Sequence, residues 1–171
     1  MYQALCTMKN TYHVRVEGIR FDAAHFATYG GSCEPLHGHS YEVAAEAGGR
    51  LNQDALVINF TSLKARLREL SRELDHRFLL QRESTVLEIE DTESAWKVRT
   101  PGGIGYVLPK QDVVALPIDN TTAERLAQWF SGRLWDGLDD RVTAGVESLT
   151  VEVWEGPGQR GSYQIERLPL A

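Results

Sequence analysis

Apolar and polar residues alternate along four parts of the chain, and a period of two is typical of β-strands with one buried face. The first strand is predicted over residues 12–26, with a possible bulge at Gly18, and the second over residues 37–47. Two more are predicted over residues 147–155 and 162–168. The first two strands most simply form an antiparallel hairpin with a long functional loop between them.

Between these pairs of strands, apolar residues recur every three to four positions, which predicts two helices. The first is expected over residues 60–74, with Asn59 as its N-cap. The second begins near Thr122, where Thr121 and Glu124 fit a capping box. The apolar stripe of the first helix consists of Phe60, Leu63, Leu67, Leu70 and Leu74.

Residues 81–118, between the helices, consist of short strand-like runs separated by turn signals, which predicts an inserted β-hairpin or meander. The element order is therefore β-β-α-α-β-β with this insertion. Hairpins combined with helices on one face of a sheet indicate the α+β class. A length of 171 residues suits one domain, so we expect residues 1–171 to form a single unit that contains the insertion.

Composition narrows the possible functions. The net charge of −6 argues against general binding to nucleic acid or to anionic membranes, because both favour a basic surface. No apolar run approaches the roughly 18–20 residues of a membrane span, and the N-terminal residues do not resemble a signal peptide. Two cysteines do not make a disulfide framework, so we expect a cytoplasmic protein.

Three of the five histidines lie close together in the sequence. His37 and His39 are two apart at the start of a predicted strand, so their side chains share one face, and His25 lies near the end of the partnering strand. Three histidines and one open position are a ligand set for catalytic zinc. The alternative is that these are ordinary surface or hydrogen-bonded core histidines, but their grouping favours a Zn²⁺ site.

Cys33 lies four residues before His37, and the sequence leaves its role open. It could be a fourth ligand that closes a structural zinc site. It could instead be an acid–base or nucleophilic thiol beside the metal. A third interpretation is a small buried apolar residue.

Three further polar residues are candidates for a site. Asp75 and His76 follow the first predicted helix and could relay protons with Cys33, or His76 could simply interact with the helix dipole. Glu155 ends the third predicted strand, where a carboxylate can accept hydrogen bonds from the amino and ring N–H groups of a heterocycle. The alternative for Glu155 is an ordinary exposed acid.

Several short motifs occur here in one order. They are FDAAH at residues 21–25, C-x₃-HGH-x-Y at residues 33–41, LDH at residues 74–76, NTTAE at residues 120–124, and the strand-end Glu155. This ordered set resembles the 6-pyruvoyltetrahydropterin synthase and 6-carboxytetrahydropterin synthase family of the tunnelling fold. The resemblance covers about residues 13–80 and 118–165.

The resemblance implies a four-stranded antiparallel sheet with two helices on one face. It implies that His25, His37 and His39 bind zinc, that Cys33, Asp75 and His76 are catalytic, and that Glu155 binds the pterin. Family members act on 7,8-dihydroneopterin triphosphate. Their subunits join edge to edge into homo-oligomers, commonly hexamers or a trimer or dimer subset of one, with sites at subunit interfaces.

Within the family, the C-x₃-HGH spacing resembles the branch that makes 6-carboxy-5,6,7,8-tetrahydropterin for 7-deazaguanine and queuosine synthesis. The branch that makes the 6-pyruvoyl product usually has a longer spacing. Glu34 also forms E-x-x-HGH, which resembles a folate-linked branch that cleaves the pterin side chain. A different class of function is a non-catalytic zinc-binding or ligand-binding protein of the same fold.

The chain departs from the family pattern in three places. Asn59 stands where Asp is frequent, and the two are nearly equivalent as helix caps. Gly156 follows Glu155 where Thr is common, which affects hydrogen bonding near the pterin. The insertion at residues 81–118 has no counterpart in compact members and could cover the site, extend the oligomer or reshape the pocket.

Overall fold

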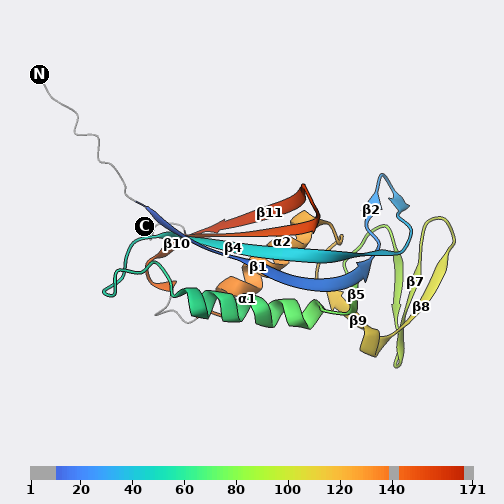
Figure 1. The fold of residues 1–171 in the computed structure, drawn as a ribbon. Coiled ribbons are helices and arrows are strands. Elements are labelled where there is room, and N and C mark those ends of the chain that lie inside the picture. Colours follow the sequence, from blue (N-terminus) through green and yellow to red (C-terminus); the bar gives the residue numbers. More distant parts are fainter. Residues whose placement is uncertain (1–10, 139–142, 168–171) are drawn as a thin grey trace, which may run out of the picture.

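A six-stranded sheet forms the body of the protein (Figure 1) in a computed structural model that describes residues 11–138 and 143–167. Across the sheet the strands are β11 (Gln159–Glu166), β10 (Val146–Gly156), β4 (His37–Gly49), β1 (Tyr12–His25), β5 (Arg77–Gln81) and β9 (Val113–Leu116). The first four pair antiparallel, which confirms the predicted four-stranded sheet. The sheet is wider than predicted, because β5 and β9 extend it in parallel beyond β1.

β1 follows the predicted alternation after its bulge, whereas β4 buries residues 43–45 in a row. A register shift between Val16 and Ile19 forms the bulge, and Gly18 within it has a φ of 73°, a left-handed conformation that glycine adopts without strain. The last strand ends at Glu166, and residue 168 of the predicted strand lies outside the described residues. After the bulge, every second residue of β1 faces the helices again.

Both predicted helices are present on one face of the sheet. Helix α1 (Phe60–Leu74) begins at Asn59, whose side chain accepts hydrogen bonds from the backbone of Thr61 and Ser62. Helix α2 (Ala123–Asp136) is capped by Thr122. The predicted capping box was therefore placed one residue early, because the hydroxyl of Thr121 donates to a distant backbone carbonyl instead.

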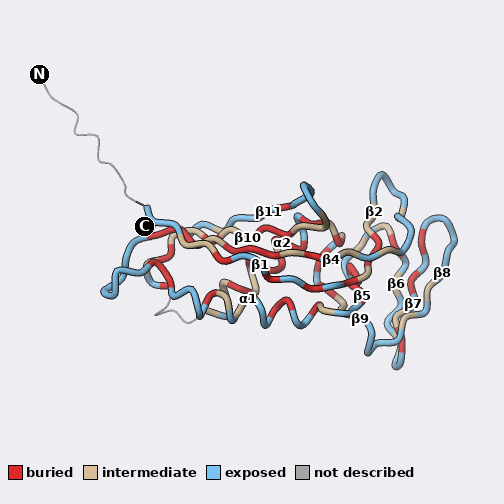
Figure 2. Tube along the Cα trace, viewed as in Figure 1, coloured by how far each residue is buried: buried red, intermediate tan, exposed pale blue. Residues whose placement is uncertain are grey.

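The main core lies between the sheet and the two helices (Figure 2). The four leucines of the α1 stripe are fully buried there, whereas Phe60 is exposed. Phe21 of β1 stacks on Tyr41 of β4 with ring centroids 4.8 Å apart, and Phe130 of α2 packs against Phe21. This aromatic layer supports the sheet close to the end where the histidines lie.

The insertion forms the predicted meander. Its strands are β6 (Glu88–Asp91), β7 (Ala95–Arg99) and β8 (Gly105–Pro109), and a short 3₁₀ helix, η1 (Lys110–Asp112), leads back to β9. The ends of the predicted insertion, Gln81 and residues 113–116, belong to the main sheet rather than to the meander.

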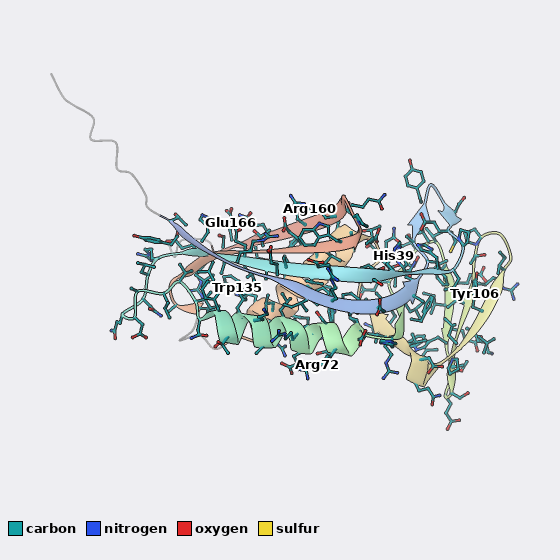
Figure 3. All side chains as sticks on the ribbon, viewed as in Figure 1. His39, Arg72, Tyr106, Trp135, Arg160 and Glu166 are labelled. Carbon is teal, nitrogen blue, oxygen red and sulfur yellow. The ribbon has the colours of Figure 1, made fainter. Side chains whose placement is uncertain are left out.

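A second, smaller core joins the meander to the main sheet. Phe26 and Phe78 contact each other in it, and Tyr106 of β8 packs on Phe26 with ring centroids 5.3 Å apart. The hairpin of β2 (Thr28–Tyr29) and β3 (Ser32–Cys33) contributes to the same core. Figure 3 shows Tyr106 and His39 toward the same end of the molecule. The described helices include none long and apolar enough to cross a membrane.

Candidate metal centre and pocket

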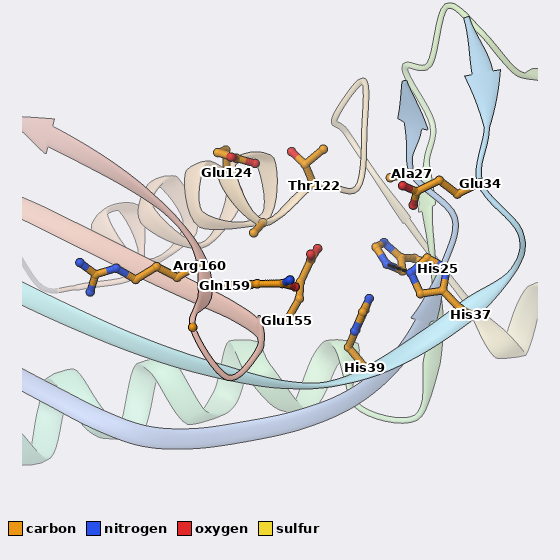
Figure 4. A pocket seen from close by; sticks show the side chains of 12 residues that line it. His25, Ala27, Glu34, His37, His39, Thr122, Glu124, Glu155, Gln159 and Arg160 are labelled. Carbon is orange, nitrogen blue, oxygen red and sulfur yellow. Dashed lines mark hydrogen bonds between the residues drawn. The ribbon is translucent and has the colours of Figure 1, made fainter. Parts of the chain in front are cut away.

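The three predicted histidines come together because of the register between β1 and β4. His25 pairs with His37, and Ala23 pairs with His39, so the three imidazoles project from the same face of the sheet (Figure 4). One ring nitrogen from each lies within 4.8 Å of the others, and the Nε2 atoms of His25 and His37 are 3.1 Å apart. This arrangement could hold a metal ion.

The other ring nitrogens show that the site suits a cation. The Nδ1 atoms of His25 and His37 lie 3.0 Å and 2.8 Å from the carbonyl oxygens of Thr121 and Pro35, and His39 hydrogen-bonds the backbone of Glu155. A carbonyl only accepts, so Nδ1 of His25 and His37 carries the hydrogen and Nε2 keeps a lone pair. A metal ion would stabilise two such lone pairs that face each other. Carbonyl groups that bind the second ring nitrogen, as here, are typical of metal-binding histidines.

Two of the histidines in this cluster do not readily take up a proton in place of a metal ion. Burial first, and then the neighbouring His37 and His39, together lower the pKa of His25 to about 4. Burial also lowers the pKa of His39. At neutral pH these two imidazoles are therefore in the neutral form that binds metals.

The histidines form one wall of a cavity of about 590 Å³. Three carboxylates also line it, from Glu34, Glu124 and Glu155, together with Gln159 and Arg160 at its other end. Burial, and then Glu124 and Glu34, raise the pKa of Glu155. In Figure 4 Glu155 lies between α2 and His39, and Arg160 points away from the histidines.

Cys33 does not join the histidine cluster and does not line this cavity. Its side chain packs at the margin of the small core beneath the meander, and its thiol donates to the carbonyl of Glu34 at 3.4 Å. The closed Cys-His₃ site considered from the sequence is therefore not formed among the described residues. Burial, and then Glu34, raise the pKa of the Cys33 thiol.

The raised pKa predicts that Cys33 is a slow nucleophile at neutral pH in this chain. In a Cys6→Ser background, we expect iodoacetamide to alkylate Cys33 more slowly at pH 7 than it alkylates an unstructured peptide thiol, because less thiolate is present. The difference should shrink as the pH rises above 9. The same protein unfolded in guanidinium is the control, and faster alkylation of the folded protein at pH 7 would contradict the expectation.

Asp75 and His76 form a separate cluster with Asp22. One oxygen of Asp75 accepts from the backbone N–H of Asp22 at 2.9 Å and lies 3.0 Å from Nδ1 of His76. The backbone N–H of His76 donates to the Asp22 carbonyl at 2.6 Å and holds His76 at a φ of 57°. These contacts with β1 fix a left-handed turn directly after α1.

The sheet separates this second cluster from the histidines. The Asp22 carboxylate accepts from Ser40, and both residues project from the face opposite that of His39, because they are one residue out of phase with it. Among the described residues of one chain, Cys33 forms no hydrogen bond with Asp75 or His76, and its thiol donates to the carbonyl of Glu34 instead. The catalytic roles given to these three residues stay predictions.

Several residues at the site had no role in the sequence-based prediction. Thr121 was interpreted only as a cap, yet its carbonyl receives a hydrogen bond from His25. Gln81 was assigned to the insertion, yet it is fully buried beside Thr121. Glu124 and Gln159 were not singled out as pocket residues. The NTTAE motif was the one signal that could have pointed to Thr121 and Glu124.

The model of the 6-pyruvoyl tetrahydropterin synthase family matches residues 13–166. The chain belongs to this family. It is 33% identical over 139 residues to a Pyrococcus horikoshii protein whose name provisionally assigns it as a 6-carboxy-5,6,7,8-tetrahydropterin synthase, with 80% of each chain covered. A 6-carboxy-5,6,7,8-tetrahydropterin synthase of Haemophilus influenzae is 27% identical over 151 residues, covering 84% of this chain and 93% of the relative.

Solved structures of the family show the same fold. The 6-pyruvoyltetrahydropterin synthase of Plasmodium vivax superimposes with a TM-score of 0.87 at 29% identity, covering 93% of this chain and all of that one. The same protein was also solved with a catalytic glutamate replaced by alanine, and that structure matches equally well.

Proposed function

We propose that this protein is a zinc-dependent lyase that converts 7,8-dihydroneopterin triphosphate to 6-carboxy-5,6,7,8-tetrahydropterin. The observation that carries the proposal is the convergence of three histidines, two with Nδ1 directed at backbone carbonyls, on a pocket that also holds Glu155. The names of the Pyrococcus horikoshii and Haemophilus influenzae relatives support the same product. This product would place the protein in the cytoplasm, in 7-deazaguanine and queuosine synthesis.

His25, His37 and His39 would hold the zinc ion, which would act as a Lewis acid toward a hydroxyl oxygen of the substrate side chain. The Glu155 carboxylate would accept hydrogen bonds from the amino and ring N–H groups of the pterin and would orient the ring in the pocket. With the pterin fixed in this way, the side chain of the substrate would extend toward the histidines. Cys33, Asp75 and His76 would move protons to and from it.

We also propose that the active protein is a homo-oligomer, with a hexamer as the expected form. β5 pairs with β1 only at Ala23 and Ala24, so the edge of β1 from residue 12 to residue 22 has no partner strand within the described chain. β11 forms the opposite edge. Joining these two edges between subunits would satisfy both, and Cys33 of one subunit would then work with Asp75 and His76 of a neighbour.

The direct test is a product assay. Zinc-loaded protein is incubated with 7,8-dihydroneopterin triphosphate, and the products are identified by liquid chromatography and mass spectrometry. We expect 6-carboxy-5,6,7,8-tetrahydropterin, inorganic triphosphate and acetaldehyde, which carries away the other two carbons of the side chain. A protein that binds zinc stoichiometrically and forms no pterin product would favour a non-catalytic ligand-binding role.

One observation favours a second candidate function, the folate-linked cleavage of the pterin side chain, which gives a product other than the 6-carboxy pterin. Glu34 lines the cavity beside the histidines, whereas Cys33 does not. The Plasmodium vivax relative has a glutamate as a catalytic residue. In the 6-pyruvoyl-type activity the side chain is instead retained, so the product distinguishes the candidates.

The substitution Glu34→Gln separates these activities. If Glu34 serves as the base for cleavage, we expect the rate at which the cleaved pterin forms to fall by a factor of about 10²–10⁴, the usual contribution of a general base. The 6-carboxy product should persist. Cys33→Ala is the matched variant at the neighbouring position, and equal loss of every product in both variants would contradict separate roles.

A further inference from the structure

A buried amide lies behind the histidine cluster, and the proposed function does not use it. Gln81 ends β5, and its side chain is 0% exposed. Its Nε2 donates to the carbonyl of Phe26 at 2.9 Å, and its Oε1 accepts from Oγ1 of Thr121 at 3.4 Å. A buried side-chain amide with both ends engaged specifies one arrangement of the groups around it.

The Phe26 carbonyl is the point where this network meets the metal centre. Phe26 directly follows His25, and its carbonyl accepts from Nε2 of Gln81. The single hydroxyl hydrogen of Thr121 is shared between this carbonyl, at 3.2 Å, and Oε1 of Gln81. The carbonyl of Thr121 in turn receives Nδ1–H of His25 at 3.0 Å. The backbone of residues 25–26, Thr121 and Gln81 therefore form a closed ring of contacts around one metal-binding histidine.

A second pair of hydrogen bonds keeps the same two segments side by side. The side chain of Asn120 accepts from the backbone N–H of Thr28 at 2.9 Å and donates to the Thr28 carbonyl at 2.8 Å. The exit of β1 is thus fastened to the segment that leads into α2. Gln81, at the end of β5, contacts both of these segments through Phe26 and Thr121.

We propose that Gln81 is a positioning residue for the metal centre. Through the Phe26 carbonyl and Thr121, it fixes the direction of the His25 imidazole, and so the direction of the Nε2 lone pair. The inference rests on the proposed function in one respect, namely that the histidine cluster binds zinc. Outer hydrogen-bond partners of metal ligands are known to affect metal affinity in this way.

The experiment compares metal binding by the full chain and by Gln81→Leu. Zinc affinity is measured by competition with a chromophoric chelator, and the visible spectrum of the Co²⁺-substituted protein reports the coordination geometry. We expect zinc affinity to fall about tenfold, at the lower end of the range for outer partners, and the cobalt bands to shift. Gln81→Glu keeps the size of the side chain but loses the donor to Phe26, so it should behave similarly.

Two further variants separate positioning from general stability. Thr121→Ser keeps the hydroxyl and should retain zinc affinity, whereas Thr121→Val loses it and should resemble Gln81→Leu. Ser131→Ala is the matched control, because Ser131 is equally buried but donates to the Tyr163 carbonyl of β11. It should lower the thermal midpoint of the metal-free protein without changing zinc affinity or the cobalt spectrum.

The outcomes distinguish this inference from the function on which it rests. If the wild-type chain binds no zinc, the proposed function is wrong. If the wild type binds zinc and Gln81→Leu binds it with unchanged affinity and an unchanged cobalt spectrum, the positioning role is wrong. If Gln81→Leu does not fold, unchanged zinc affinity in Gln81→Glu and Thr121→Val would likewise show that the positioning role is wrong.

Discussion

His37→Ala is expected to lower zinc affinity by a factor of about 10²–10³. Apparent binding free energies of structural zinc sites are about 10–16 kcal/mol for four ligands, or roughly 2.5–4 kcal/mol for each one. His37 is well suited to the test because it lies at the start of β4, only partly buried, with Nδ1 bonded to the nearby Pro35 carbonyl. Its removal therefore disturbs the metal site more than the core.

The measurement is competition with a chelator of known affinity, combined with the metal content of the purified protein. His13→Ala is the control, since His13 lies on the same strand as His25 but is exposed and contacts Glu46 on the other face of the sheet. It should bind zinc as the wild type does. If His37→Ala and His13→Ala bind zinc equally well, the histidine cluster is not the metal site.

The long elements could be predicted from the sequence because their apolar residues recur with a regular period. β1 buries alternate residues after its bulge and α1 buries one stripe, although β4 and β10 also bury consecutive residues. The short strands β5 and β9 were missed because FLL and VVAL are continuous apolar runs of a few residues, without alternation. β5 becomes a strand here by pairing with β1, and β9 by pairing with β5, and no local pattern records these contacts between distant segments.

The site was predictable only in part, for a related reason. The spacing of His37 and His39, with His25 on the partner strand, fixes a shared face once the strands are paired. The partner of Nδ1 in His25 is Thr121, 96 residues away, and local sequence cannot identify it. The direction of Cys33 was likewise undetermined, because the meander supplies the apolar residues against which it packs.

The second large effect expected concerns a site divided between subunits. Cys33→Ala and His76→Ala should each lower turnover of 7,8-dihydroneopterin triphosphate by about 10²–10⁴-fold, if both groups transfer protons. Within one chain, Cys33 lies by the meander, whereas His76 is bound to the backbone of Asp22 beyond the sheet. These positions favour a site in which the two residues come from different subunits.

Mixed oligomers test this division directly. When the two variants are unfolded together and reassembled in equal amounts, an interface that joins an intact Cys33 to an intact His76 forms by chance in about one quarter of the sites of a cyclic oligomer. We therefore expect about one quarter of wild-type turnover to return on mixing, although each variant alone stays inactive. A variant carrying both substitutions, mixed with either single variant, is the control, because its subunits supply neither group. If Cys33 and His76 act within one chain, mixing restores nothing, since every chain in the mixture lacks one of them.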